Sequence, residues 1–230
     1  MLFDLSSAIE IFKTTLLGIP TTILVTVGTL AVSLPLGLLI AVIRVNHFRI
    51  LDQLAAIYVS VIRGVPLVIQ IFLIFNIVPR LVVTVTQSRD IFHVNPILYA
   101  FLVFWLGYTA LLSEVFRSAI IALDPGQLEA ACSVGMTAGQ AYRRILLPQM
   151  LTSALPNIGN ITLSLIKGSS LVYLMGIQDI TAYAIIAAAG NLRYFEAYLD
   201  IFIIYLVICV AVNKLFEKVE IHLRKYQFQA

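Results

Sequence analysis

Long apolar runs without charge are the feature that most restricts how this chain can fold. Leu16 to Ile43 contains no charged side chain, and Pro96 to Leu123 contains only Glu114 and Arg117. About 20 apolar residues in a helix cross the hydrocarbon core of a bilayer, where the backbone must satisfy its own hydrogen bonds. These runs therefore predict transmembrane helices.

Further stretches of similar length follow the same pattern. We expect one all-α, polytopic membrane domain over residues 1–230, with spans at about 16–43, 53–78, 96–123, 152–176 and 198–216. The apolar segment from Ile180 to Gly190 reaches only about 16 Å as a helix, which is too short to cross. We expect it to be re-entrant or interfacial.

The composition excludes a soluble protein. The sequence is 60% hydrophobic and 12% charged, whereas soluble domains carry about 25% charged residues. The two cysteines, Cys132 and Cys209, suit neither a disulfide nor a metal site. The first charges are Asp4, Glu10 and Lys13, without a basic start before an apolar segment, so we expect no cleaved signal peptide.

Basic residues predict the orientation, because they gather on the cytoplasmic side of membrane proteins. With the C-terminus inside, the cytoplasmic segments hold Arg44, Arg49, Arg143, Arg144, Lys214, Lys218, Arg224 and Lys225. The external segments then hold only Lys13, Arg80, Arg89 and Arg193. We expect the N-terminus outside, the C-terminus inside and the loop at 124–148 in the cytoplasm.

This loop contains signals for two short helices. Asp124 suits an N-cap and Pro125 the first helical position, so a helix should run to about Val134, with Gly135 in the left-handed conformation after it. Thr137 and Gln140 have the spacing of a capping box that starts a second helix. Pro148 should prevent this second helix from continuing smoothly.

The first of these helices offers a surface of small residues. Leu128, Ala131 and Cys132 share one face, while Glu129 and Ala130 lie to its sides. Small side chains let the backbone of a partner approach closely. A structured connector between two spans is the alternative.

In order along the loop, its residues resemble the EAA loop of permease subunits in binding-protein-dependent ABC importers. The resemblance lies in Glu129, Ala130, Ala131, Gly135, Ile145, Leu147 and Pro148, and we count Leu128 with them as a residue of the docking loop. It implies a type I ABC importer permease fold, whose loop forms a coupling helix in a groove of a cytoplasmic ATPase. ATP and magnesium would then be bound by that ATPase, with no cofactor on this chain.

Further residues, most of them outside the loop, are similar to the polar amino acid branch of this family. They are Arg63-Gly64-Val65-Pro66, Gln70, Glu114, Arg117, Gly126-Gln127, Pro156, Asn160, Lys167 and Ser169-Ser170-Leu171. The resemblance covers about residues 14–220. Gly168 departs from it, since many relatives have an acidic or amide residue there.

The resemblance also implies partners and a cellular location. We expect two permease chains, identical or related, two ATPases, and an extracellular or periplasmic binding protein that delivers an amino acid for import across the cell membrane. ATP-driven closure of the ATPases would switch access to the pathway from one side to the other. Nucleic acid is not expected as a partner.

Ionisable side chains at membrane depth are costly and need partners or water. Arg63 and Glu114 should each lie roughly 14 to 15 Å above the cytoplasmic helix ends, Arg117 about one turn lower, and Lys167 at or above the midplane. We expect the four to line one central cavity, together with Gln70, Gly168, Ser169 and Ser170 as candidate pathway residues.

Each of these charges also has a purely structural interpretation. Glu114 and Arg117, three residues apart on one helix, can simply neutralise each other. Arg63 can extend to the interface or bind carbonyls that Pro66 leaves free. Lys167 has no acidic neighbour in its own helix, which favours a role toward a ligand. The formal sum of +2 favours a zwitterionic or anionic amino acid.

No enzymatic activity is expected of this chain. The phosphate-binding pattern G-x-x-x-x-G-K-[ST] does not occur, so ATP must be hydrolysed on another subunit. A secondary carrier without ATP remains a second hypothesis, and a membrane scaffold or receptor that uses the docking loop for signalling remains a third. Coupling-ion sites would favour the carrier, whereas the charges at membrane depth argue against the scaffold.

Overall fold

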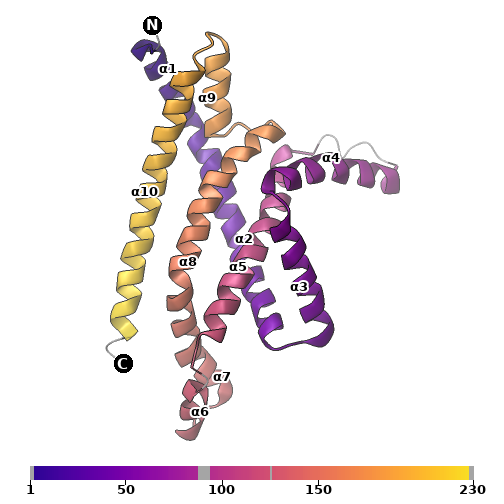
Figure 1. Cartoon of the computed structure of the whole chain (residues 1–230), viewed down its shortest axis with the longest axis vertical. Coiled ribbons are helices and arrows are strands. Elements are labelled where there is room, and N and C mark those ends of the chain that lie inside the picture. The colour runs from indigo at the N-terminus through magenta and orange to yellow at the C-terminus, as the bar shows by residue number, and fades with distance from the viewer. Residues whose placement is uncertain (1–2, 88–93, 125, 228–230) are drawn as a thin grey trace.

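The computed structural model describes residues 3–87, 94–124 and 126–227, and every regular element within these ranges is helical. Helical segments long and apolar enough to cross a membrane are Leu5–Val45, Leu67–Thr86, Pro96–Ile121, Ala138–Met175 and Tyr194–Leu223. They number 5 within the described ranges, which confirms the predicted all-α polytopic fold. The two termini lie at opposite ends of the long axis (Figure 1).

The first span is longer than the predicted 16–43. It comprises α1 (Leu5–Thr15), a 3-10 turn (Leu16–Gly18) and α2 (Ile19–Val45). The Asp4 carboxylate starts α1 by accepting a hydrogen bond from the Ser6 N–H. Gly18 is required by packing, because a Cβ there would lie 2.2 Å from the backbone nitrogen of Ile180. The chain at 180 therefore packs directly onto the first span.

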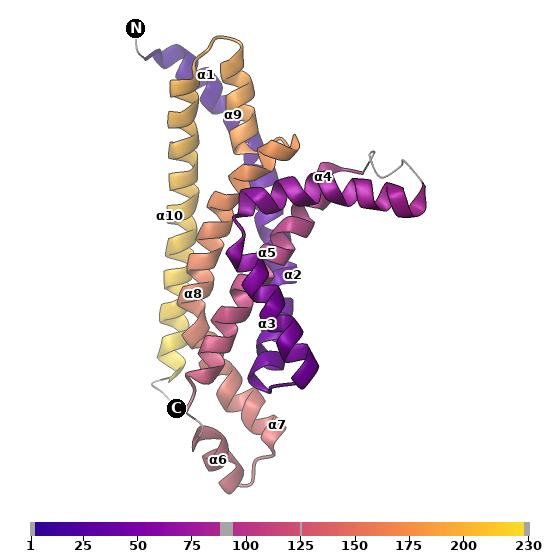
Figure 2. The ribbon, with the colours of Figure 1, turned by 45° about the vertical axis from the view of Figure 1, so that its right-hand side comes forward.

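The prediction of one continuous span at 53–78 is wrong. The chain forms α3 (Arg49–Gly64) and α4 (Leu67–Thr86) instead, and α4 projects sideways from the bundle (Figures 1 and 2). Val65, between them, is extended, with φ −108° and ψ 128°. A proline disfavours the helical conformation of the residue before it and provides no N–H, so Pro66 ends α3.

The helix α5 (Pro96–Ile121) forms the centre of the bundle and agrees with the predicted 96–123. It packs along α2, and the Trp105 indole N–H donates to the Gly28 carbonyl at 3.0 Å. The Tyr58 hydroxyl of α3 donates to the Leu106 carbonyl at 2.6 Å. The side chain of Phe104 is completely buried in the apolar core around this helix.

Of the remaining helices, α8 (Leu147–Gly168) packs against α5, and α10 (Tyr194–Gln227) packs against α8. The fourth span is α8, which continues as a 3-10 segment (Ser169–Met175), and the fifth is α10, longer than the predicted 198–216. The short apolar helix α9 (Ile180–Ala189) agrees with the predicted segment and packs against α1 and α10. Its N-cap, Asp179, accepts from the Ala182 N–H at 2.9 Å.

Two short helices extend beyond the bundle at the end that carries the C-terminus (Figures 1 and 2). They are α6 (Gly126–Ser133) and α7 (Ala138–Ala141), and α7 passes into a π-helical turn (Tyr142–Leu146). We expected Pro148 to interrupt this helix, but the helix continues into α8. The helical hydrogen-bond pattern changes only in the π turn, where the Leu147 N–H bonds to the Tyr142 carbonyl, five residues back.

Candidate functional site

The loop at 124–148 has the capped helices that its sequence predicts. The Asp124 carboxylate accepts from the Gly126 N–H at 2.9 Å, and Gly135 has a φ of +88°. Thr137 and Gln140 form the complete capping box, with bonds of 3.0 and 3.3 Å. Pro125 lies outside the described residues. The loop is thus held in one shape by local hydrogen bonds.

The outward face of α6 carries some of the residues that the sequence predicts to dock a partner. Glu129 and Ala130 are exposed, whereas Ala131 is buried against the rest of the loop and Leu128 is half-buried. Cys132 is exposed, although the sequence places it on the same helical face as Leu128 and Ala131. Further along, Ile145 is half-buried and Leu147 and Pro148 are exposed. Glu129 and Ala130 are therefore free to meet another protein.

Gln70 holds together the break between α3 and α4. Its Nε2 group donates to the carbonyls of Ile62 at 2.9 Å and Val65 at 2.8 Å. In a continuous helix the Ile62 carbonyl would accept from the residue four positions later, which is Pro66 and has no N–H. The Gln70 side chain is only 8% exposed. It thus supplies a donor that the backbone lacks.

The structure brings Gly168 to this break. A Cβ at Gly168 would lie 2.8 Å from the Tyr108 hydroxyl and 3.5 Å from Cδ2 of Leu67, the first residue of α4. Next to it, Ser169 is buried and donates to the Ile166 carbonyl at 2.7 Å, and Ser170 donates to the Lys167 carbonyl at 2.7 Å. The end of α8 therefore meets the start of α4 beside the phenol of Tyr108.

The charged side chains separate into a paired group and two single cations. Glu114 bonds to Arg117, with Nη2 to Oε2 at 2.9 Å, and also to Arg44 of α2. The Arg44 Nε lies 4.0 Å from the Asp52 carboxylate of α3. Arg44, Asp52, Glu114 and Arg117 together have no formal net charge. This group ties α2, α3 and α5 together at the end of the bundle that leads into the loop.

Arg63 and Lys167 behave differently. Both are exposed, and neither has an ion-pair partner within residues 3–87, 94–124 and 126–227. Arg63 is in the last turn of α3 and Lys167 in the last turn of α8. Along the chain, Lys167 directly precedes Gly168, and Arg63 lies four residues before Leu67.

Residues 33–225 match the family described as the binding-protein-dependent transport system inner membrane component. This chain belongs to that family. It is an amino-acid ABC transporter permease subunit and a multi-pass protein of the cell membrane. Membership implies an ATPase and a substrate-binding protein as partners.

Several curated relatives resemble the permease over nearly its whole length. A probable amino-acid permease, YxeN of Bacillus subtilis, is 37% identical, with 90% of each chain covered. The L-cystine transport system permease TcyL of the same organism is 31% identical, covering 98% of this permease and 93% of the relative. Both are permease proteins, in agreement with the family.

Solved structures show the same fold. A crystal structure of an amino acid ABC transporter with histidines matches at a TM-score of 0.83 and 30% identity, covering 96% of this permease and 100% of that chain. The MetNI methionine ABC transporter in an inward-facing conformation matches at a TM-score of 0.65 and 15% identity, covering 94% and 95%. The second likeness shows the fold alone.

Two residues of this permease site were missed by sequence reasoning. Arg44 was assigned only to an inner segment, although it bonds to Glu114 across 70 sequence positions. The need of Glu114 for a partner was the only signal in the sequence. Tyr108, which reaches Gly168, lies within a uniformly apolar run, so no signal distinguished it.

Proposed function

We propose that this permease moves a polar amino acid, zwitterionic or anionic, across the cell membrane by alternating access. The observation that carries the substrate preference is that Arg63, at the end of α3, and Lys167, next to Gly168, have no ion-pair partner among the described residues. Charged side chains at membrane depth mark substrate pathways, and a carboxylate compensates a positive site. The other charges at the site sum to zero, so these two cations provide the whole formal +2.

The relatives leave the substrate open. TcyL is named for L-cystine, whereas ArtQ of Bacillus subtilis is named for arginine and HisQ of Escherichia coli for histidine, lysine, arginine and ornithine. We base the proposed preference on Arg63 and Lys167 of this chain. Gln70, Ser169 and Ser170 are proposed to shape the same pathway from the α4 and α8 sides.

We further propose that the loop at 124–148 couples the permease to a separate ATPase. The exposed Glu129 and Ala130 support this role, as do the capping bonds that hold α6 and α7 in a fixed arrangement. In this assembly two permease chains, identical or related, form the pathway, two ATPases bind ATP and magnesium, and a binding protein delivers substrate. The N-terminus is proposed to lie outside and the loop in the cytoplasm.

Uptake into vesicles tests the substrate preference. The assembled transporter is supplied with labelled glutamate, glutamine, cystine or arginine. Uptake of each amino acid is measured with and without ATP on the side of the membrane where the ATPase lies. We expect glutamate, glutamine or cystine to be carried in preference to arginine. Strict preference for arginine would contradict the proposed role of the two cations.

Co-purification in detergent tests the docking role. The variant Glu129→Lys reverses one exposed charge on α6, and we expect the ATPase to separate from the permease. The control Gln53→Lys adds a positive charge at an exposed position of α3, outside the loop, and should retain the ATPase. Undiminished association of Glu129→Lys would count against the docking assignment.

A further inference from the structure

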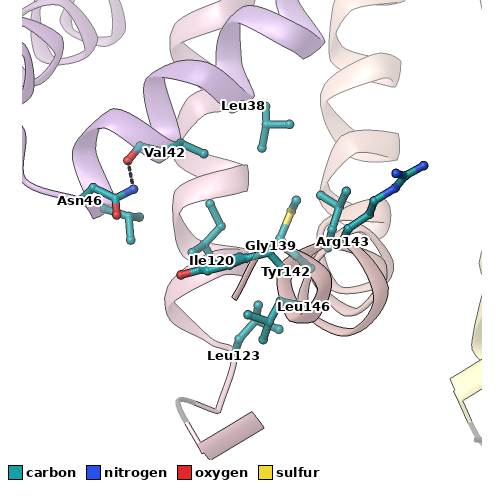
Figure 3. A pocket seen from close by; sticks show the side chains of 12 residues that line it. Leu38, Val42, Asn46, Ile120, Leu123, Gly139, Tyr142, Arg143 and Leu146 are labelled. Carbon is teal, nitrogen blue, oxygen red and sulfur yellow. Dashed lines mark hydrogen bonds between the residues drawn. The ribbon is translucent and has the colours of Figure 1, made fainter. Parts of the chain in front are cut away.

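An apolar cavity of about 540 Å³ lies beside the loop, between α2, α5 and the helix that runs from α7 into α8 (Figure 3). Its apolar walls include Leu38, Val42, Ile120, Leu123, Leu146 and Met150. Figure 3 shows Tyr142 lying across this space from the π turn. The cavity is distinct from the docking residues of α6 and from the junction at Gly168.

The cavity lies where the membrane-spanning segments end. The wall from α2 runs from Leu38 down to Val45, the last residue of that helix, and ends at the polar Asn46. The wall from α5 ends at Leu123, directly before Asp124. One end of the cavity is thus adjacent to apolar span and the other to the polar loop.

A polar pocket of about 650 Å³ adjoins this cavity. Thr137, Gln140 and Arg144 line it, and Gly139 and Arg143 line both spaces. Gly139 leaves free space at this boundary, because a Cβ there would meet no other atom within 4 Å. The apolar and polar spaces therefore adjoin at Gly139 and Arg143 and together form an amphipathic site.

The polar pocket is positively charged. Arg143 and Arg144 are exposed, and neither has an ion-pair partner in the part of the chain that the structure describes. Figure 3 shows Arg143 pointing away from the apolar cavity, opposite to Tyr142. The π turn at Tyr142–Leu146 thus separates an apolar side from a basic side. Such turns occur frequently at functional sites.

We propose that these two spaces bind one anionic phospholipid, with an acyl chain in the apolar cavity and the phosphate between Arg143 and Arg144. Charge complementarity carries this choice, because two free arginines adjoin an apolar space at the boundary of the spans. Basic pockets between membrane helices bind anionic headgroups, to which arginine offers a fork of donors. A neutral lipid or an apolar protein segment would leave both guanidinium groups without a counter-charge.

Photo-crosslinking in vesicles tests this site with the full chain. Phosphatidylglycerol or phosphatidylcholine, each with a diazirine in one acyl chain, is added as a trace to phosphatidylcholine vesicles that contain the permease. Mass spectrometry then locates the labelled residues. We expect phosphatidylglycerol to label Leu38–Asn46 and Tyr142–Met150 about thirtyfold more than phosphatidylcholine, as two basic residues near a membrane surface imply.

Two variants separate the basic and apolar parts of the site. Arg143→Gln with Arg144→Gln should remove the preference for phosphatidylglycerol, whereas Lys214→Gln with Lys218→Gln, an equal loss of charge on exposed positions of α10, should preserve it. Gly139→Leu places a side chain in the free space at the boundary between the two spaces and should abolish labelling by both lipids. The yield of folded protein in detergent shows whether each variant is intact.

Three results would overturn the proposal. The first is equal labelling of these segments by the two lipids in the unchanged protein. The second is a preference for phosphatidylglycerol that survives the loss of both arginines. The third is complete loss of labelling when the ATPase is bound, which would show that the partner subunit covers the site instead of a lipid.

Discussion

The side-chain amide of Gln70 donates a 2.9 Å hydrogen bond to the Ile62 carbonyl, replacing the backbone donor that Pro66 lacks. This bond spans the break at which α4 leaves the bundle. It allows α3 to end at Arg63-Gly64 without leaving the Ile62 carbonyl unpaired. The same Nε2 group donates a second hydrogen bond to the Val65 carbonyl.

Replacing Gln70 by leucine should therefore destabilise the permease. The apolar side chain keeps the approximate size but removes both donated bonds, and we expect the free energy of unfolding to fall by about 1 to 3 kcal/mol. Thermal unfolding in detergent measures the change. Gln70→Glu should behave similarly, since an ionised carboxylate has no proton to donate. Asn76→Leu is the control, because its amide bonds only to Phe72 within α4, and unchanged stability of Gln70→Leu would contradict the role.

Arg44 and Glu114 should be energetically coupled. The two side chains join α2 to α5, and each has only about a fifth of its side chain exposed, 17% and 20%. Unfolding of Arg44→Gln, Glu114→Gln and the double variant should give an interaction energy of about 1 to 3 kcal/mol. Arg49→Gln, an exposed change in α3, combined with Glu114→Gln should be additive. If the effects of Arg44→Gln and Glu114→Gln on the free energy of unfolding simply add, the ion pair contributes nothing to stability.

Gly168 should tolerate a methyl group only when the Tyr108 hydroxyl is absent. A Cβ at 168 would lie 2.8 Å from that oxygen, which is shorter than a carbon–oxygen contact permits. We expect Gly168→Ala to lower transport about tenfold or more, since small displacements at a pathway carry such costs. Adding Tyr108→Phe should restore most of the activity. If Tyr108→Phe alone is active but does not rescue Gly168→Ala, the loss of transport in Gly168→Ala does not come from a clash with the Tyr108 hydroxyl.

Lys167 should contribute to the preference for a carboxylate. In the uptake assay, Lys167→Gln should raise the KM for the preferred substrate by about tenfold, corresponding to about 1.4 kcal/mol. Lys214→Gln removes the same charge from an exposed position of α10 and should leave the KM unchanged. An unaltered KM in Lys167→Gln would remove this residue from the pathway.

Local interactions explain which features the sequence predicts well. The caps at Asp124, Thr137 and Gly135 involve neighbours within a few residues, so their residue types and spacing determine the geometry. The apolar run at 96–123 likewise predicts α5, because length and hydropathy decide whether a segment can cross a bilayer. The number of spans and the capped helices of the loop agree with the sequence prediction, whereas the coupling role of the loop stays a prediction.

Features that depend on distant contacts were not predicted. Hydropathy treats 53–78 as continuous, since Val65 and Pro66 are apolar, although the backbone restriction before a proline would have indicated the break. The bond from Arg44 to Glu114 and the approach of Tyr108 to Gly168 arise only when α2, α5 and α8 pack together. Spacing along one helix identified Arg117 as a partner for Glu114 but had no means to identify Arg44.

ATP-dependent uptake tests the proposed coupling most directly. The permease, its ATPase and its binding protein are reconstituted in vesicles without ion gradients, and uptake of labelled glutamine is followed after ATP is supplied. We expect uptake that requires ATP and is lost in Glu129→Lys while Gln53→Lys remains active. Equal uptake without ATP would contradict coupling through the loop. In a parallel assay with an ion gradient across the vesicle membrane, uptake driven by that gradient alone would favour a secondary carrier.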